Sequence, residues 1–400
     1  MVSLMAKKAN KAAKHAKKTT GHAKHATRRA PRHRSSAEAQ PVVRRKITSA
    51  DDQEIARVAD STKARIFVIG IGGSGSNTMD RMSELRIEGT TLIATNTDAP
   101  HLETVSAHRK ILLGRNTTKG LGAGSDPALG EDAAVESTEE LKHAIEGAQM
   151  IFINCGLGGG TGTGAAPVIA GIAKESGALT IALVTLPFTS EGKTRMKNAL
   201  QGLSRLKRNT DTTIVIPNDK LLVAEELTLD KAFKKVDDVL ANATKGILEM
   251  ITIPGMVNLD FADLKGVLKD SGYAVIGVGE SRVADEQKRI DSAISTTLDS
   301  PMLDIDMSKA RKALVSIVGG SDLTLKEAEN VFHAVSSRIS DDAMLKWGAR
   351  IDPTMHKNTL KVMIVMSGME LAKYVEETIQ QSSEQPISTD DLGIDEIDGY

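Results

Sequence analysis

The clearest chemistry in this sequence lies in a glycine-rich stretch, residues 154–167, which reads NCGLGGGTGTGAAP. An apolar run typical of a buried strand precedes it, and an apolar helical segment, residues 168–173, follows. A strand, a glycine loop and a helix in this order present backbone N–H groups and a helix N-terminus to an anion. Because glycine has no Cβ atom, a phosphate can approach such a backbone closely. We therefore expect a phosphate-binding loop rather than a merely flexible turn. The residues expected to bind are Gly158, Gly159, Gly160, Thr161, Gly162, Thr163 and Gly164.

This loop differs from a P-loop, in which a lysine at the end of the motif reaches the terminal phosphates. Residues 154–167 contain no lysine, so the backbone and the two threonine hydroxyls must bind the phosphates. The stretch also contains Cys155, the only cysteine of the chain. No motif with a histidine or aspartate partner accompanies it, so we expect a small core residue rather than a nucleophile. A single cysteine excludes an internal disulfide and fits a reducing cytoplasm.

Two further glycine-rich loops follow apolar runs, at residues 70–77 (GIGGSGSN) and 119–127 (KGLGAGSDP). The first matches the GxGxxG fingerprint of dinucleotide-binding proteins, and Asp98, 28 residues after Gly70, could bind a ribose. An NAD-dependent oxidoreductase of the Rossmann type is therefore an alternative. Such an enzyme needs one phosphate loop at its first strand, whereas this chain has three. The number of loops favours one larger phosphate pocket.

The loops can form one pocket only if a parallel sheet brings them to the same edge, because the carboxyl ends of parallel strands meet there. The apolar runs predict such a sheet, with helices between the strands. The strands are expected at residues 65–69, 91–97, 111–114, 150–153, 180–187 and 213–216.

After this sheet, residues 229–251 have the apolar spacing of one long helix. Phe233 could be the first member of its buried stripe. Residues 264–371 contain four further apolar runs, with helices expected at 285–298 and 324–338. We expect a second, smaller α/β domain here, with a mixed sheet and helices on one face.

Taken in order, these motifs resemble the FtsZ family of tubulin-like GTPases, the archaeal type more than the bacterial. The resemblance covers the chain from about Ala64 to Val365, and it depends on the order of the motifs more than on any one of them. The matching segments are residues 70–77, 96–98, 120–127, 156–164, 191–195, 217–219, 233–238 and 258–263. Departures are the serines at 74 and 76 in the first loop and a long basic segment at the N-terminus.

The resemblance implies GTP and GDP as ligands, with Mg²⁺ on the phosphates. In the family, Glu191 and Arg195 would meet the ribose and phosphates, although their spacing alone also fits a surface ion pair. Phe233 would stack on guanine while Asn218 and Asp237 read its edge. A carboxylate can accept from both N1–H and the 2-amino group of guanine, which adenine does not offer. The other nucleotide-binding residues are Gly72, Gly73, Ser74, Gly75, Ser76, Asn77, Asn96, Asp98, Gly122, Ala123 and Gly124.

The resemblance also implies that catalysis depends on Asn258, Asp260 and Asp263, which follow the long helix. A simpler alternative is that the two aspartates cap the next helix, and both roles can coexist. A long helix would carry the aspartates away from the nucleotide of their own subunit. The family's solution is head-to-tail stacking into a protofilament, in which the acidic loop of one subunit completes the site of the next. FtsZ filaments form the cytokinetic ring, so we expect a cytoplasmic protein at the mid-cell division site.

Charge is distributed unevenly along the chain. Residues 1–46 contain fourteen Lys/Arg and one acid, a net charge of +13, whereas the whole chain has −1 and residues 47–400 therefore carry −14. The basic segment has too few apolar residues to fold, so we expect a disordered arm. It could bind an anionic membrane, nucleic acid or acidic protein surfaces; a transit peptide is a weaker alternative. The acidic tail contains the peptide DDLGIDEID, residues 390–398, which could fold into a groove of a membrane anchor or division protein, or simply aid solubility.

The expected organisation is an arm, a GTP-binding domain, a central helix, a C-terminal domain and a flexible tail. Their boundaries are expected at residues 1–46, 47–227, 228–253, 254–371 and 372–400. The expected function is a self-assembling GTPase of cell division. A tubulin-like paralogue for cell shape and a GTP-binding scaffold without hydrolysis remain alternatives to it.

Overall fold

The computed structural model describes residues 64–368, except residues 86, 88, 222–227 and 301–305. The predicted basic arm and acidic tail therefore lie outside the described residues. No helix within the described part of the chain is long and apolar enough to cross a membrane.

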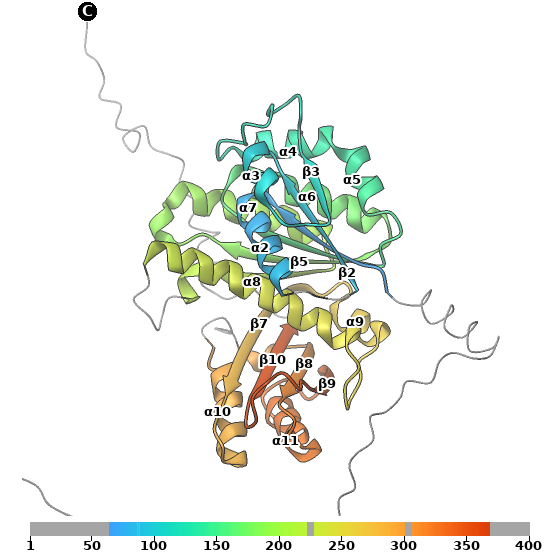
Figure 1. Cartoon of the computed structure of the whole chain (residues 1–400), viewed down its shortest axis with the longest axis vertical. Coiled ribbons are helices and arrows are strands. Elements are labelled where there is room, and N and C mark those ends of the chain that lie inside the picture. Colours follow the sequence, from blue (N-terminus) through green and yellow to red (C-terminus); the bar gives the residue numbers. More distant parts are fainter. Residues whose placement is uncertain (1–63, 86, 88, 222–227, 301–305, 369–400) are drawn as a thin grey trace, which may run out of the picture. The chain divides into compact units, whose positions relative to one another are not determined.

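The architecture is α/β, built on one sheet of ten strands in the order β3-β2-β1-β4-β5-β6-β7-β10-β8-β9 (Figure 1). Neighbouring strands from β3 to β7 are parallel, β10 is antiparallel to both β7 and β8, and β9 is parallel to β8. The strands are β1 Ile66–Ile71, β2 Thr90–Asn96, β3 Arg109–Leu112, β4 Met150–Gly156, β5 Leu179–Leu186, β6 Thr212–Pro217, β7 Gly272–Ser281, β8 Lys312–Gly319, β9 Met344–Ile351 and β10 Leu360–Ser367.

Helices cover both faces of the parallel half, which explains why its strands are apolar throughout. In β4, Met150 and Phe152 belong to one buried cluster, with α2 and α8, and Ile151 and Ile153 to another, with α6 and α7. Cys155 lies in the second cluster, where burial raises the pKa of its thiol to about 12, as expected of a core residue. The helices are α2 Gly72–Glu84, α3 Ala99–Thr104, α4 Pro127–Glu136, α5 Thr138–Ala144, α6 Gly160–Glu175, α7 Lys193–Asn209, α8 Leu229–Thr252, α9 Phe261–Leu268, α10 Glu286–Leu298 and α11 Leu325–Ser336, with short 3₁₀ turns η1 Thr189–Glu191, η2 Asn218–Leu221 and η4 Met307–Lys309.

Helix α8 is the predicted long helix, and it is shared by the two halves of the fold. Its buried stripe, which includes Val236, Leu240 and Ile247, lies in the same cluster as residues of β1, β4 and β5 and of the C-terminal strands β8 and β10. Phe233 is 40% exposed and is not part of this stripe. The interpretation of Phe233 as a core residue is therefore wrong.

The expected second domain is present, but its strands extend the first sheet instead of forming a separate one. β6 and β7 pair over three residues only, from Thr212–Gly272 to Ile214–Ala274. Helices α10 and α11 pack on the C-terminal strands in a cluster of their own.

The structure corrects two expectations of local structure. The third strand, β3, begins and ends two residues earlier than expected, because Gly114 turns the chain at φ +63°. The second correction concerns the main glycine stretch: helix α6 already begins at Gly160, so residues 160–164 form its first turns and the loop itself is short.

Candidate functional site

The three predicted glycine loops lie together at the carboxyl edge of the parallel strands. Thr97, after β2, and Thr161, at the start of α6, share a hydrogen bond of 2.6 Å between their hydroxyls. The backbone N–H of Gly122 donates to the Thr97 carbonyl, which ties the third loop to the end of β2. A Cβ atom on Gly72 would lie 3.0 Å from the backbone nitrogen of Gly162. The three glycine loops and the end of β2 therefore lie together, as the predicted parallel sheet required.

The main glycine loop exposes backbone at the N-terminus of α6. Gly158 has φ +103°, a left-handed conformation that glycine adopts without strain, and Gly159 is the N-cap of the helix. The Thr163 hydroxyl accepts a hydrogen bond from the Gly158 N–H at 2.8 Å, and Thr163 is buried. Thr163 therefore closes the loop, while the half-buried Thr161 and the free N–H groups of the first turn remain for an anion.

Several glycines of this stretch permit close packing of the backbone. A Cβ atom on Gly164 would lie 2.0 Å from the carbonyl oxygen of Pro127, at the start of α4. A Cβ on Gly162 would lie 2.4 Å from the carbonyl of Gly156. Gly160 is similarly close to the buried Ala123 and to the backbone of Asp126. The glycines therefore position α6 against its neighbours, so that its N-terminus faces the loops.

In the third loop, Gly122 and Gly124 both have positive φ, and a Cβ on Gly124 would meet nothing within 4 Å. This part of the loop is open to an incoming group.

Asp98 has a structural role, because its carboxylate accepts from the His101 N–H at 2.9 Å and caps α3. The side-chain oxygen of the buried Asn96 accepts from the Thr97 N–H and shapes the same turn.

Asp237, expected to recognise guanine, contacts the first glycine loop. Asp237, in α8, accepts hydrogen bonds from Ser74 Oγ at 3.4 Å and Asn77 Nδ2 at 3.3 Å. Burial raises the pKa of Asp237 to about 6, although both hydrogen bonds lower it. Gly73 is exposed and Gly75 packs against the Asn154 carbonyl, where a Cβ would lie at 2.5 Å.

Two buried polar atoms near these loops have no hydrogen-bond partner. They are Asn218 Oδ1, directly after β6, and Ser76 Oγ, in the first turns of α2. An unpaired buried polar atom is costly, and Asn218 is one of the residues expected to contact the base. The third atom of this kind in the described chain, Ser367 Oγ, lies at the end of β10.

An aromatic pair is found beside Asn218. The exposed ring of Phe233 contacts the edge of the Phe188 ring, with centroids 5.3 Å apart. Phe188 directly precedes η1, which contains Glu191. The Glu191 carboxylate accepts from the Phe188 N–H at 2.8 Å and pairs with Arg195 Nη1 at 2.8 Å. The ion pair expected from the spacing is therefore formed, and the Arg195 side chain is 46% exposed.

Sequence reasoning missed His101. Its Nε2 lies 3.2 Å from Asn77 Oδ1 and its Nδ1 lies 3.4 Å from the Asn96 amide, so it links the first glycine loop to the end of β2. The sequence contained one signal: His101 lies three residues after Asp98, a residue type whose side chain often caps a helix. Only the fold brings it next to Asn77.

The acidic loop lies apart from all these residues. Asp237 and Thr252, the last residue of α8, are fifteen residues apart, or roughly 22 Å along the helix axis. Asn258, Asp260 and Asp263 come after that end, so the structure does not bring them to the glycine loops of the same chain. Asp260 caps α9 by accepting from the Asp263 N–H at 2.7 Å, as the simpler alternative expected.

No group of three or more His, Cys, Asp or Glu side chains in the described chain could hold a metal ion. Mg²⁺ that is bound chiefly by substrate phosphates and water needs no such group. The exposed backbone and open glycine positions of the loops fit a ligand of this kind.

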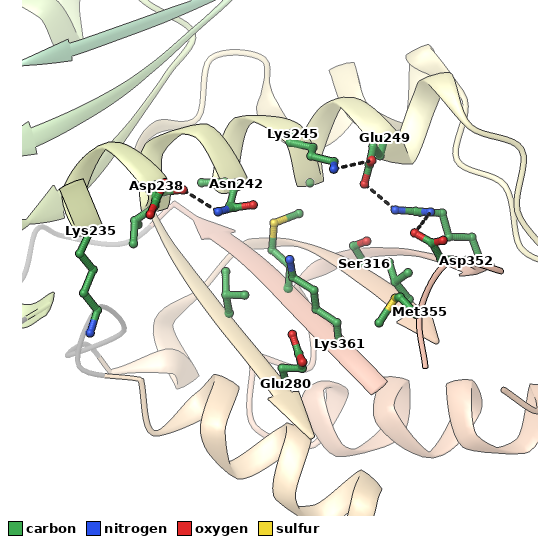
Figure 2. Close-up of a pocket in the computed structure, with 17 residues that line it drawn as sticks. Lys235, Asp238, Asn242, Lys245, Glu249, Glu280, Ser316, Asp352, Met355 and Lys361 are labelled. Carbon is green, nitrogen blue, oxygen red and sulfur yellow. Dashed lines mark hydrogen bonds and ion pairs between the residues drawn. The ribbon is translucent and has the colours of Figure 1, made fainter. Parts of the chain in front are cut away.

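A cavity of about 570 Å³ lies elsewhere, between α8 and strands β7, β8 and β10 (Figure 2). Its lining contains none of the predicted nucleotide-binding residues. Ion pairs from Lys245 to Glu249, from Glu249 to Arg350 and from Arg350 to Asp352 lie along it. The glycine loops, not this cavity, have the geometry for a phosphate.

Comparison with known proteins supports this choice. Residues 65–225 match the profile described as Tubulin/FtsZ family, GTPase domain, and residues 272–370 match that of the FtsZ family, C-terminal domain. Cell division protein FtsZ 1 of Pyrococcus abyssi is 49% identical over 362 residues, which are 89% of this chain and 96% of that protein.

Solved structures share the fold. An empty FtsZ dimer of M. jannaschii has a TM-score of 0.76 and 51% identity, and the match covers 80% of this chain and 93% of that one. A GTPγS-bound protofilament of CetZ2 from Haloferax volcanii has a TM-score of 0.70 at 23% identity, with 80% and 98% coverage. At that identity the likeness extends to the fold alone.

Proposed function

Since the chain belongs to the FtsZ branch of the tubulin/FtsZ family of GTPases, we propose that it assembles head to tail into protofilaments that act in cell division. Each subunit binds GTP at its glycine loops, and the acidic loop of the next subunit completes the site for hydrolysis. The identity of about 50% to cell division proteins favours this role over a cell-shape paralogue. The family match leaves the dehydrogenase alternative without support.

The observation that carries the proposal is the distance along α8 between the expected nucleotide-binding residues and the acidic loop. The nucleotide residues lie beside its first half and the acidic loop follows its last turn, at least roughly 22 Å away. Asp260 and Asp263 cannot reach a nucleotide bound to their own subunit. A second copy, docked with its acidic loop on the glycine loops, brings them together. A contact between two different faces of the same molecule propagates into a filament.

In this proposal, the first turns of α2 and α6 hold the phosphates with backbone N–H groups, and Arg195 adds a positive charge. Asp237 and Asn218 read the guanine edge, and the exposed ring of Phe233 stacks on the base. Mg²⁺ on the β- and γ-phosphates neutralises part of their charge when it is bound. The carboxylates of Asp260 and Asp263, with Asn258, orient the attacking water. GDP then weakens the joint between subunits.

The test is phosphate release measured over a range of protein concentrations, with sedimentation of filaments in parallel. We expect activity with GTP and little with ATP, and we expect the turnover per subunit to rise sharply once filaments sediment. Equal turnover per subunit below and above the assembly threshold would contradict hydrolysis between subunits. Sedimentable filaments without any phosphate release would instead support the scaffold alternative.

A further inference from the structure

The side chain of Lys346 contacts the acidic loop, and no motif pointed to this residue. It lies in β9, an edge strand of the sheet, 83 residues after Asp263. Its Nζ is 2.7 Å from Asp263 Oδ1. The lysine side chain is 42% exposed and the aspartate 29% exposed, so both reach the surface where a neighbouring subunit would dock.

The same strand also holds the backbone of the acidic loop. Val257 and Ala349 exchange two backbone hydrogen bonds of 3.1 Å, an antiparallel bridge on the open edge of β9. Gly255 packs so closely on the Ala349 carbonyl that a Cβ would lie at 2.4 Å. The backbone of the acidic loop is thus bound to β9 at Ala349, three residues after Lys346. The ammonium of Lys346 is presented to Asp263 from a rigid element.

Two charged groups act directly on the Asp263 carboxylate. Asp260 belongs to the same capping box, and Lys346 faces it from β9. The hydrogen bond from Lys346 is the main cause that lowers the pKa of Asp263, and the Asp260 backbone N–H adds to it. Lys265, exposed on the next turn of α9, is not a partner of Asp263.

We infer that Lys346 is a positioning residue for hydrolysis, which holds the Asp263 carboxylate in the correct orientation for the nucleotide of the neighbouring subunit. This inference rests on the proposed function. Without this cation, only the capping-box hydrogen bond from the Asp260 N–H to Asp263 Oδ2, 3.4 Å long, holds the carboxylate near the negative charges of Asp260 and of the incoming triphosphate. Lys346 fixes Oδ1, and Oδ2, whose hydrogen bond is long, can also accept from water.

The test compares Lys346→Met with Lys346→Arg in the full chain. Methionine keeps the length and apolar stem of lysine without its charge. We expect Lys346→Met to bind GTP and to sediment with a slowly hydrolysed GTP analogue like the wild type. Its turnover per sedimented subunit should fall about tenfold or more, because a misoriented catalytic group is costly. Arginine, which keeps the cation, should restore most of the turnover.

Lys265→Met is the matched control, because it removes a nearby positive charge without touching Asp263. Emission from Trp347, the only tryptophan, reports whether β9 is intact in each variant. Wild-type turnover per sedimented subunit in Lys346→Met overturns the inference, and so does an equal loss in Lys265→Met. Failure of Lys346→Met to sediment with the analogue overturns it too, because the lysine would then act in docking. The proposed function fails separately, if wild-type turnover is independent of protein concentration.

Discussion

At the scale of single residues, Asp237 is buried, accepts hydrogen bonds from Ser74 and Asn77, and in the proposed function reads the guanine base. Its side chain must be ionised to accept from two donors of guanine. Burial nevertheless raises its pKa to about 6. Protonation of the carboxyl therefore already competes with nucleotide binding at a pH just below neutral. Because this carboxylate is already partly desolvated in the free protein, the further free-energy cost of desolvating it on ligand binding is smaller.

We therefore expect GTP affinity to fall as the pH drops through about 6, because the protonated carboxyl of Asp237 no longer accepts from the base. Below this value each pH unit should weaken binding by up to about tenfold. Equilibrium dialysis of GTP between pH 5 and 8 measures the effect. Asp237→Asn should bind weakly with little of this dependence. His101→Gln changes a neighbour in the same hydrogen-bond chain, through Asn77, and should retain the pH dependence. A wild-type GTP affinity that does not change between pH 5 and 8 would contradict the assignment of this effect to Asp237.

In the proposed function, Asp263 acts in hydrolysis and not in assembly. We expect Asp263→Ala to bind GTP and to form filaments, because the aspartate lies far from the glycine loops of its own chain. Turnover should fall by roughly 10²-fold or more, the usual contribution of a positioned acid–base group. Phosphate release and sedimentation of the same sample measure both properties. Asp270→Ala, an exposed aspartate after α9, is the control; undiminished hydrolysis by Asp263→Ala would remove the role of the acidic loop.

At the scale of elements, the start of α6 shows how a glycine stretch can serve packing and binding together. The helix begins at Gly160 inside the motif, and its first turns lie against the backbone of α4 and the end of β4. The exposed N–H groups at its N-terminus depend on this close approach. Glycine is poorly suited to a helix interior, so its repeated presence here needs the steric reason that the structure supplies.

This explanation predicts opposite effects of alanine at two positions of α6. Gly164→Ala places a methyl group about 2.0 Å from the Pro127 carbonyl and should destabilise the fold by about 1–3 kcal/mol or more. Gly171→Ala has no neighbour closer than 4.0 Å and should be neutral or stabilising by up to about 1 kcal/mol. Chemical denaturation followed by circular dichroism compares them. Equal stability of the two variants would show that close packing at Gly164 is unimportant.

At the scale of the whole molecule, α8 connects the two halves of the fold. It packs in one apolar cluster with strands from both halves of the sheet. It also sets the distance between the nucleotide residues near its first turns and the acidic loop after its last. The continuous sheet adds to this rigid connection, because β6 and β7 join the halves directly.

The basic arm, residues 1–46, lies outside the described residues, and we propose for it a role that is independent of hydrolysis. Deleting it should leave GTP turnover of the remaining chain unchanged. It should weaken binding to anionic vesicles or to DNA, and the difference should shrink as salt rises, because the attraction depends on released counterions. Co-sedimentation with vesicles and retention on DNA at several salt concentrations measure this. Neutral vesicles are the control, and equal binding with and without the arm would exclude both partners.

The sequence by itself determined the strand, loop and helix order of the nucleotide half, the long helix and the acidic loop after it. These features are local, because periodicity, glycine content and capping residues act within a few positions along the chain. Only the tertiary structure decided that residues 160–164 are helical, that Phe233 is exposed, and that burial shifts the pKa of Asp237. It also paired Lys346 with Asp263 across 83 residues. Such contacts depend on the position of an edge strand and on packing between distant segments, which no local pattern encodes.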